Sequence, residues 1–132
     1  MQTRHSPVRF EDILSTAKGK DEAFEELTCQ LARRNPPDKA VEFRRIHGAG
    51  GDGGVEAYWV LDDGSEVGYQ AKYYLRSVEV RWAAIDESVK TALKLHPRLR
   101  TYYVAIACGL TDRTVRKGKT GWEEWEEHKK TW

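Results

Sequence analysis

The fold of this chain is decided by residues 48–73, which read GAGGDGGVEAYWVLDDGSEVGYQAKY. A DG pair at 63–64 separates two runs that are rich in aromatic and β-branched residues, and this pattern predicts a β-hairpin. Side chains alternate between the two faces of a strand, so Gln70 and Lys72 share one face of the second strand. Glu56 belongs to the first strand. We therefore expect a carboxylate beside an amide and a lysine on neighbouring strands.

The length and charge of the chain limit what it can be. Its 132 residues are enough for one domain with a core and too few for two. Charged residues make up 33% of the chain, but the two signs nearly cancel to a formal net charge of +1. So small a net charge gives no general attraction for polyanions. Any binding of nucleic acid must therefore come from a local cluster of basic residues.

Cysteine usage and hydropathy indicate a cytoplasmic protein that does not enter a membrane. The two cysteines, Cys29 and Cys108, each fall in an apolar periodic segment, which favours buried free thiols in a reducing compartment over a disulfide. There is no run of 18 apolar residues and no apolar N-terminal segment. The sequence therefore predicts neither a membrane span nor a signal peptide.

The segments around the hairpin predict alternating helices and strands. Apolar spacing predicts a helix over 9–17, a second helix with Asp21 as N-cap that ends before Asn35, and a helix over 78–92 capped by Ser77. We expect strands over 41–46 and 101–107, the latter buried on both faces, then a loop over 112–120 and a final helix from Trp122. This order predicts an α/β fold, a three-layer α/β/α sandwich around a central mixed sheet.

The end of the sequence bears on domain organisation. The last helix reaches Trp132 with no terminating signal. We therefore expect residues 1–132 to form a single domain at the N-terminus of a longer protein.

The polar residues of the hairpin suit a divalent cation and a phosphate. Magnesium prefers oxygen ligands, and carboxylates of Glu56 and of Asp52 in the preceding loop, with the amide oxygen of Gln70, are such ligands. Lys72 would stabilise charge that develops on phosphate or position the attacking water. The glycines at 50, 51, 53 and 54 would let the backbone approach a ligand closely. The alternative is an exposed hairpin face with an ordinary Glu, Gln and Lys, preceded by a loose glycine connection.

Three motifs together resemble one nuclease family. FEEL at 24–27 is similar to its F-E-x-L helix, GGDGGVE at 50–56 to its G-x-G-D-G-G-I-D segment, and QAK at 70–72 to its Q-x-K. The chain thus resembles the Mrr-type restriction endonuclease branch of the PD-(D/E)xK nuclease superfamily, over roughly residues 24–110. The resemblance implies the α-β-β-β-α-β order of a restriction-endonuclease-like fold.

The same resemblance implies a metal site and the residues that form it. It assigns catalysis to Glu25, Glu56, Gln70, Lys72 and Asp52, with Mg²⁺ or Mn²⁺ held by Glu25, Glu56, Asp52 and Gln70. The branch usually has aspartate at the position of Glu56. Either Glu56 or Asp52 is therefore the carboxylate that contacts the metal, and we favour Glu56 because a strand holds its side chains more firmly than a glycine loop.

A second similarity concerns the C-terminal half. SVKTAL at 88–93, HP at 96–97 and the tryptophans 122 and 125 resemble N-terminal nuclease modules that are fused to large NTPases of bacterial anti-phage defence. This similarity implies a regulatory or NTPase region downstream and a domain that acts as a homo-oligomer.

The expected function is a divalent-metal-dependent endonuclease that hydrolyses double-stranded DNA. The alternatives are a catalytically silent DNA-binding module of the same fold and an assembly domain that acts through its tryptophan-bearing end. The four histidines are scattered without a zinc motif, so zinc is not expected. Basic residues that would form either a phosphate track or an ordinary solvated face are Arg33, Arg34, Arg44, Arg45, Arg113, Arg116, Lys117 and Lys119.

Overall fold

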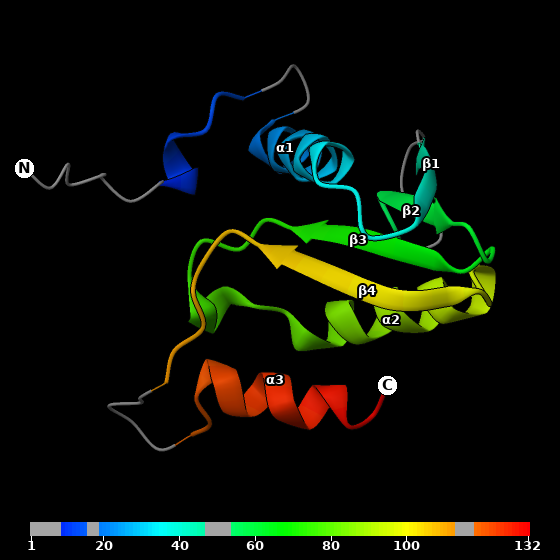
Figure 1. Ribbon diagram of the computed structural model, residues 1–132. Coiled ribbons are helices and arrows are strands. Elements are labelled where there is room, and N and C mark those ends of the chain that lie inside the picture. Colours follow the sequence, from blue (N-terminus) through cyan, green and yellow to red (C-terminus); the bar gives the residue numbers. More distant parts are fainter. Residues whose placement is uncertain (1–8, 16–18, 47–53, 113–117) are drawn as a thin grey trace, which may run out of the picture.

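A computed structural model describes residues 9–15, 19–46, 54–112 and 118–132 (Figure 1). The helices are α1 (Lys20–Arg34), α2 (Trp82–Leu95) and α3 (Gly121–Lys129), with short 3₁₀ turns η1 (Phe10–Asp12) and η2 (Ser77–Glu79). The strands are β1 (Ala40–Arg45), β2 (Ala57–Leu61), β3 (Glu66–Lys72) and β4 (Leu99–Ile106). None of the helices in these four ranges is long and apolar enough to cross a membrane.

The four strands form one mixed sheet in the order β1-β2-β3-β4. β1, β2 and β3 are antiparallel neighbours, whereas β3 and β4 run parallel and are joined through α2. Helix α1 packs on one face of the sheet, and α2 and α3 lie on the other side (Figure 1). The prediction of an α/β fold with a mixed central sheet is therefore confirmed.

Alternation along β3 and β4 divides the core into two clusters. On the α1 side, Phe24 packs with Ala71 and Ala107 and meets Phe10 in an edge-on ring contact of 5.4 Å. The cluster on the other side is formed by Val80, Ile85 and Val89, against which Tyr102 and Val104 of β4 pack. The two-residue period of the strands thus gives each face of the sheet its own cluster of core residues.

The hairpin has the predicted turn. Gly64 adopts a left-handed φ of 84°, which a residue without a Cβ takes at little cost. The carboxylate of Asp63 accepts hydrogen bonds from the backbone N–H of Ser65 at 2.8 Å and from its hydroxyl at 2.6 Å. These contacts close the turn and fix the register of β2 against β3, in which Trp59 lies opposite Val67.

The helix predicted over 9–17 is wrong for residues 9–15. Only the single turn η1 forms, and Ile13 is already extended, with φ −60° and ψ 136°. Phe10 reaches the core, but Leu14 is 89% exposed. Of the two, only Phe10 packs against the core. A short helix that buries so little apolar surface is not stable.

Two helix starts also differ from the prediction. α2 begins at Trp82 instead of after Ser77, because the Ser77 hydroxyl is used elsewhere and accepts a hydrogen bond from the backbone N–H of Thr111 at 3.2 Å. α1 begins two residues early, with Gly19 instead of Asp21 at the N-cap position, and Asp21 lies within its first turn. There its negative charge still favours the positive end of the helix.

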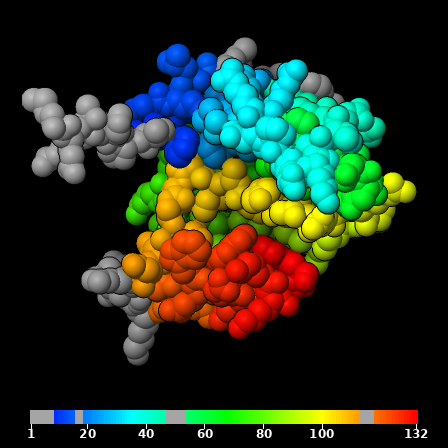
Figure 2. All heavy atoms as spheres, in the orientation of Figure 1, coloured from blue at the N-terminus to red at the C-terminus, as the bar shows by residue number. Residues whose placement is uncertain are grey.

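The final helix forms as predicted and is attached through α2. Thr120 caps it by accepting a hydrogen bond from the N–H of Glu123 at 3.1 Å. Asp86 of α2 accepts one hydrogen bond of 2.8 Å from the indole N–H of Trp132 and lies 2.8 Å from Nδ1 of His128. Figure 2 shows the red atoms of α3 lying closely against the body of the domain.

β4 is an edge strand, and the expectation that it is buried on both faces is wrong. Tyr103 is 55% exposed and stacks on Tyr69 of β3 with ring centroids 5.3 Å apart. Helix α1 does not cover this pair fully, since Leu31 on the same side is 53% exposed. Of the two free cysteines, Cys29 is buried as expected and Cys108 is partly exposed.

Candidate functional site

The candidate site is built around a contact between Glu56 and Gln70. Glu56 directly precedes β2; its backbone N–H donates to the carbonyl of Tyr69 at 2.7 Å, and its carbonyl accepts from the N–H of Ile46 at 3.0 Å. The backbone is thus held from both neighbouring strands. Nε2 of Gln70 donates a hydrogen bond of 2.7 Å to Oε1 of Glu56, and the two residues are only 6% and 9% exposed. The predicted meeting of this carboxylate and this amide is confirmed.

The other end of the Gln70 amide has no hydrogen-bond partner among the described residues. Its Oε1 is buried and accepts no hydrogen bond from the described residues. Buried polar atoms are nearly always paired, because an unpaired one loses its hydration without compensation. An amide oxygen is also one of the ligands that hard divalent cations accept. The Gln70 oxygen and the adjoining Glu56 carboxylate are therefore two groups of the kind that bind Mg²⁺ or Mn²⁺.

Lys72 follows Gln70 by two residues in β3. Strand alternation places both side chains on the same face, as predicted, and Lys72 is partly buried opposite Ile106 of β4. No ion pair engages its ammonium group within the part of the chain that the structure describes. The site thus combines a carboxylate, an amide oxygen and a cation along the junction of β2 and β3.

The buried thiol of Cys29 on α1 lies within electrostatic range of the predicted acids Glu25 and Glu56. Burial raises the pKa of Cys29 to about 11; Arg45 opposes this increase, and the charges of Glu56, Glu26 and Glu25 add to it. Glu25, on α1, and Glu56, directly before β2, therefore both influence the charge of this thiol. The described residues include no group of three His, Cys, Asp or Glu side chains that could hold a metal ion.

Asp52 and three of the four glycines, at 50, 51 and 53, lie outside the described residues. Gly54 is described, and its role differs from the predicted approach to a ligand. A Cβ at Gly54 would lie 2.2 Å from the carbonyl oxygen of Ser88 and 2.8 Å from the backbone nitrogen of Ala92. Gly54 also has a left-handed φ of 76°. Glycine is required here because the chain passes directly against α2.

Two residues near the site were not among the predicted site residues. Cys29 lies four residues after Glu25, and this helical spacing places the two on one face of α1, which was a usable signal. Arg45 ends β1 and forms an ion pair with Glu26. Burial tends to lower the pKa of Arg45, but this pair and the charges of Cys29 and Glu56 raise it overall. Its proximity to Glu56 depends on strand register, which the sequence does not encode locally.

Comparisons of the chain with models of protein families, with curated proteins and with solved structures found no match in any of the three. The chemistry of the site is therefore inferred from its own residues.

Two further polar contacts of histidines lie elsewhere and are structural. Nδ1 of His96 lies 2.9 Å from Oε1 of Glu66, both groups being largely buried, and the Tyr58 ring packs edge-on against the imidazole. This contact joins the end of α2 to β3. His128 links α3 to α2 through Asp86, as described above. Both histidines are engaged by a carboxylate at the join between two elements.

Proposed function

We propose that this chain is a divalent-metal-dependent endonuclease domain that hydrolyses phosphodiester bonds of double-stranded DNA. The observation that carries the proposal is Oε1 of Gln70, which is buried and has no partner among residues 9–15, 19–46, 54–112 and 118–132. Gln70 also contacts the Glu56 carboxylate and lies two residues before Lys72. Leaving such an oxygen unpaired costs about 1–3 kcal/mol, a cost that a bound cation removes. An ordinary surface trio of Glu, Gln and Lys would not bury this atom.

The proposed roles follow from the type and position of each side chain. Glu56 and Gln70 hold the metal, with Glu25 contributing from α1 and Asp52 from the preceding loop. The bound Mg²⁺ or Mn²⁺ supplies positive charge at the phosphate and a water of lowered pKa. Lys72 stabilises the negative charge that grows on the phosphate oxygens and orients the attacking water. Gln70 also fixes the Glu56 carboxylate through its N–H, so the acid has one orientation before substrate binds.

The arrangement of elements supports assignment to the three-layer restriction-endonuclease-like fold and to the Mrr-type branch. The order α1-β1-β2-β3-α2-β4 is the α-β-β-β-α-β order that this branch has, and helices lie on both sides of the sheet. With the motifs at 24–27, 50–56 and 70–72, this assignment implies a cytoplasmic, anti-phage nuclease. We further propose that it acts as a homo-oligomer, driven by a downstream NTPase or regulatory region.

A second candidate is a catalytically silent DNA-binding or assembly module of the same fold. It is favoured by one observation: the described acids do not form a group of three, and one oxygen of Glu56 is already occupied by Gln70. In such a module the Glu56–Gln70 contact would serve only to join β2 to β3.

Nicking of supercoiled plasmid separates the two candidates. The endonuclease cleaves with Mg²⁺ or Mn²⁺ and not with EDTA. Glu56→Gln keeps an acceptor for the Gln70 N–H and removes the charge, so we expect it to abolish cleavage, while Asp52→Asn lowers it in part. The matched control is Glu87→Gln, a carboxylate with a 74% exposed side chain on α2, which should cleave like the wild type. Failure of the wild type to nick plasmid with either metal would favour the silent module.

A further inference from the structure

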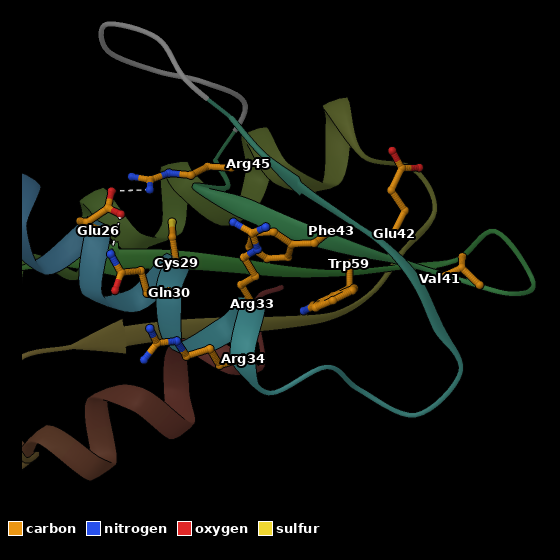
Figure 3. A pocket seen from close by; sticks show the side chains of 10 residues that line it. All are labelled: Glu26, Cys29, Gln30, Arg33, Arg34, Val41, Glu42, Phe43, Arg45 and Trp59. Atoms are coloured by element: carbon orange, nitrogen blue, oxygen red, sulfur yellow. Dashed lines mark hydrogen bonds and ion pairs between the residues drawn. The ribbon is translucent and has the colours of Figure 1, made fainter.

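A basic groove lies between α1 and β1, next to the candidate site. Its volume is about 1140 Å³, with one wall from the C-terminal half of α1, the other from β1, and the ring of Trp59 from β2 at its base (Figure 3). The basic side chains of this groove are Arg33 and Arg34 from the helix and Arg45 from the strand. They come from segments eleven or more residues apart, so only folding brings them together.

The charges in the groove are not balanced. Arg45 is neutralised by its ion pair with Glu26, whose dashed contact is drawn in Figure 3. The acid on the β1 wall, Glu42, is bound at 2.9 Å by Arg44 outside the groove. Arg33 and Arg34 are exposed and form no ion pair with any of the described residues. Two arginines are therefore available for an anion.

The groove also offers aromatic surface beside this charge. The rings of Phe43 and Trp59 lie side by side, with centroids 5.0 Å apart, and both residues are partly exposed. Trp59 is held in place because its indole N–H donates to the carbonyl of Ala32 at 2.8 Å. A rigid aromatic pair next to cations is the combination that binds unpaired bases by stacking and phosphates by charge.

We propose that the α1–β1 groove binds a single DNA strand, with its phosphates on Arg33 and Arg34 and a base against Phe43 and Trp59. A duplex keeps its bases stacked inside, so it cannot present a base to these rings. The inference rests on the proposed function for the choice of DNA. It adds to that function a binding site for a displaced or frayed strand. Arg45 of the groove lies in register opposite Ala57, the residue after Glu56, so one end of the groove is close in the sheet to the candidate site.

A simpler explanation of Arg33 and Arg34 is that they stabilise the C-terminal end of α1, where both occupy the last turn. That role accounts for their place on the helix. It does not account for the aromatic pair opposite them, and it predicts no effect of these residues on DNA binding. Measurements of binding and of stability on the same variants therefore separate the two explanations.

The test is fluorescence anisotropy of labelled oligothymidylate in EDTA, over a series of salt concentrations. Arg33→Gln/Arg34→Gln should weaken binding about tenfold or more and lower the salt slope by about 1.4, at roughly 0.7 per phosphate contact. The matched control is Arg98→Gln/Arg100→Gln, which removes the same charge from exposed arginines at the start of β4 and should bind like the wild type. Phe43→Leu should weaken binding about tenfold while the salt slope stays unchanged.

Several results would overturn the proposal. They are wild-type binding by the Arg33/Arg34 variant, equal losses in both double variants, equal affinity for a duplex of the same length, or tighter binding of oligouridylate than of oligothymidylate. Because no divalent metal is present, the outcome does not depend on cleavage. Single-strand binding without plasmid nicking would refute the proposed nuclease activity and support the proposed groove. Plasmid nicking without single-strand binding in the groove would support the nuclease and refute the groove.

Discussion

Nε2 of Gln70 lies 2.7 Å from Oε1 of Glu56, so an amide on β3 is bound to the carboxylate that precedes β2. This orientation turns the amide oxygen of Gln70 away from the carboxylate and leaves it buried, without a partner in the described part of the chain. The contact therefore fixes the orientation of the acid and leaves the second, oxygen-bearing end of the amide free of the Glu56 carboxylate. If the contact only joined two strands, the unpaired buried oxygen of the amide would cost folding free energy without any compensating interaction.

Gln70→Glu should make the stability of the protein depend on Mg²⁺. Two carboxylates in contact cannot both ionise easily, so the folded pKa of one rises above its unfolded value of about 4.3. An acid with a raised folded pKa loses stability as the pH increases from its unfolded pKa. The melting temperature of the variant should thus be lower at pH 8 than at pH 5, and Mg²⁺ should restore it at pH 8.

The matched control for this variant is Gln30→Glu on α1. Gln30 donates a 2.9 Å hydrogen bond to Glu26, which is the same pairing on an exposed face. There, solvent screens the repulsion, and we expect a small pH effect and no response to Mg²⁺. If Mg²⁺ does not change the melting temperature of the Gln70→Glu protein, Glu56 and residue 70 do not form a metal site.

Lys72→Ala should abolish cleavage and leave the fold intact. The side chain is only partly buried on a strand face, so its truncation disturbs no core cluster. Loss of a preorganised charge stabiliser typically lowers the rate by about a hundred- to a thousandfold. Plasmid nicking rates measure this, with circular dichroism to verify folding and Lys90→Ala, an exposed lysine on α2, as control. Cleavage near the wild-type rate would remove Lys72 from the mechanism.

Gly54→Ala should be strongly destabilising. The new Cβ would lie 2.2 Å from the carbonyl oxygen of Ser88, and the backbone of α2 cannot move away as a flexible side chain could. The left-handed φ of 76° adds strain for any residue with a Cβ. We expect a loss of about 2–4 kcal/mol in the free energy of unfolding in urea. Gly109→Ala, where nothing lies within 4 Å of the new Cβ, should change it by less than about 0.5 kcal/mol. Equal values for the two variants would contradict the packing against α2.

Local patterns in the sequence predicted most of the elements and the central contact. The turn at 63–64 fixed the register of β2 and β3, and register and alternation together place Glu56, Gln70 and Lys72. This succeeded because a hairpin is specified by a few adjacent residues. The failures involve partners that are distant in sequence. Nothing near Leu14 shows that the core accepts Phe10 alone, and nothing near Ser77 shows that its hydroxyl is used by Thr111.

The limits of prediction were similar at the site. The glycines at 50, 51, 53 and 54 suggested close approach of a ligand. Gly54 is instead explained by packing against the backbone of α2, more than thirty residues later in the sequence. The exposure of Tyr103 follows from the edge position of β4, which a run of apolar residues cannot reveal. Arg33 and Arg34 become distinguishable from the other basic residues only once β1 lies beside them. The sequence shows which side chains could act, but it does not show which distant segments they contact after folding.

The thiol of Cys29 should make the protein lose stability at alkaline pH. Burial, supported by the charges of Glu56, Glu26 and Glu25, raises its pKa to about 11, against about 8.5 in an unfolded chain. A thiol with a raised folded pKa contributes stability that is complete below the unfolded pKa and is lost as the pH rises toward the folded one. The free energy of unfolding, measured in urea with reductant from pH 8 to pH 10, should therefore fall more steeply for the wild type than for Cys29→Ala. Burial and the charge of Glu79 also raise the pKa of Cys108, but this thiol is only partly buried, so Cys108→Ala should stay closer to the wild-type slope than Cys29→Ala does. If Cys29→Ala and the wild type have the same slope, the thiol is not buried among these carboxylates.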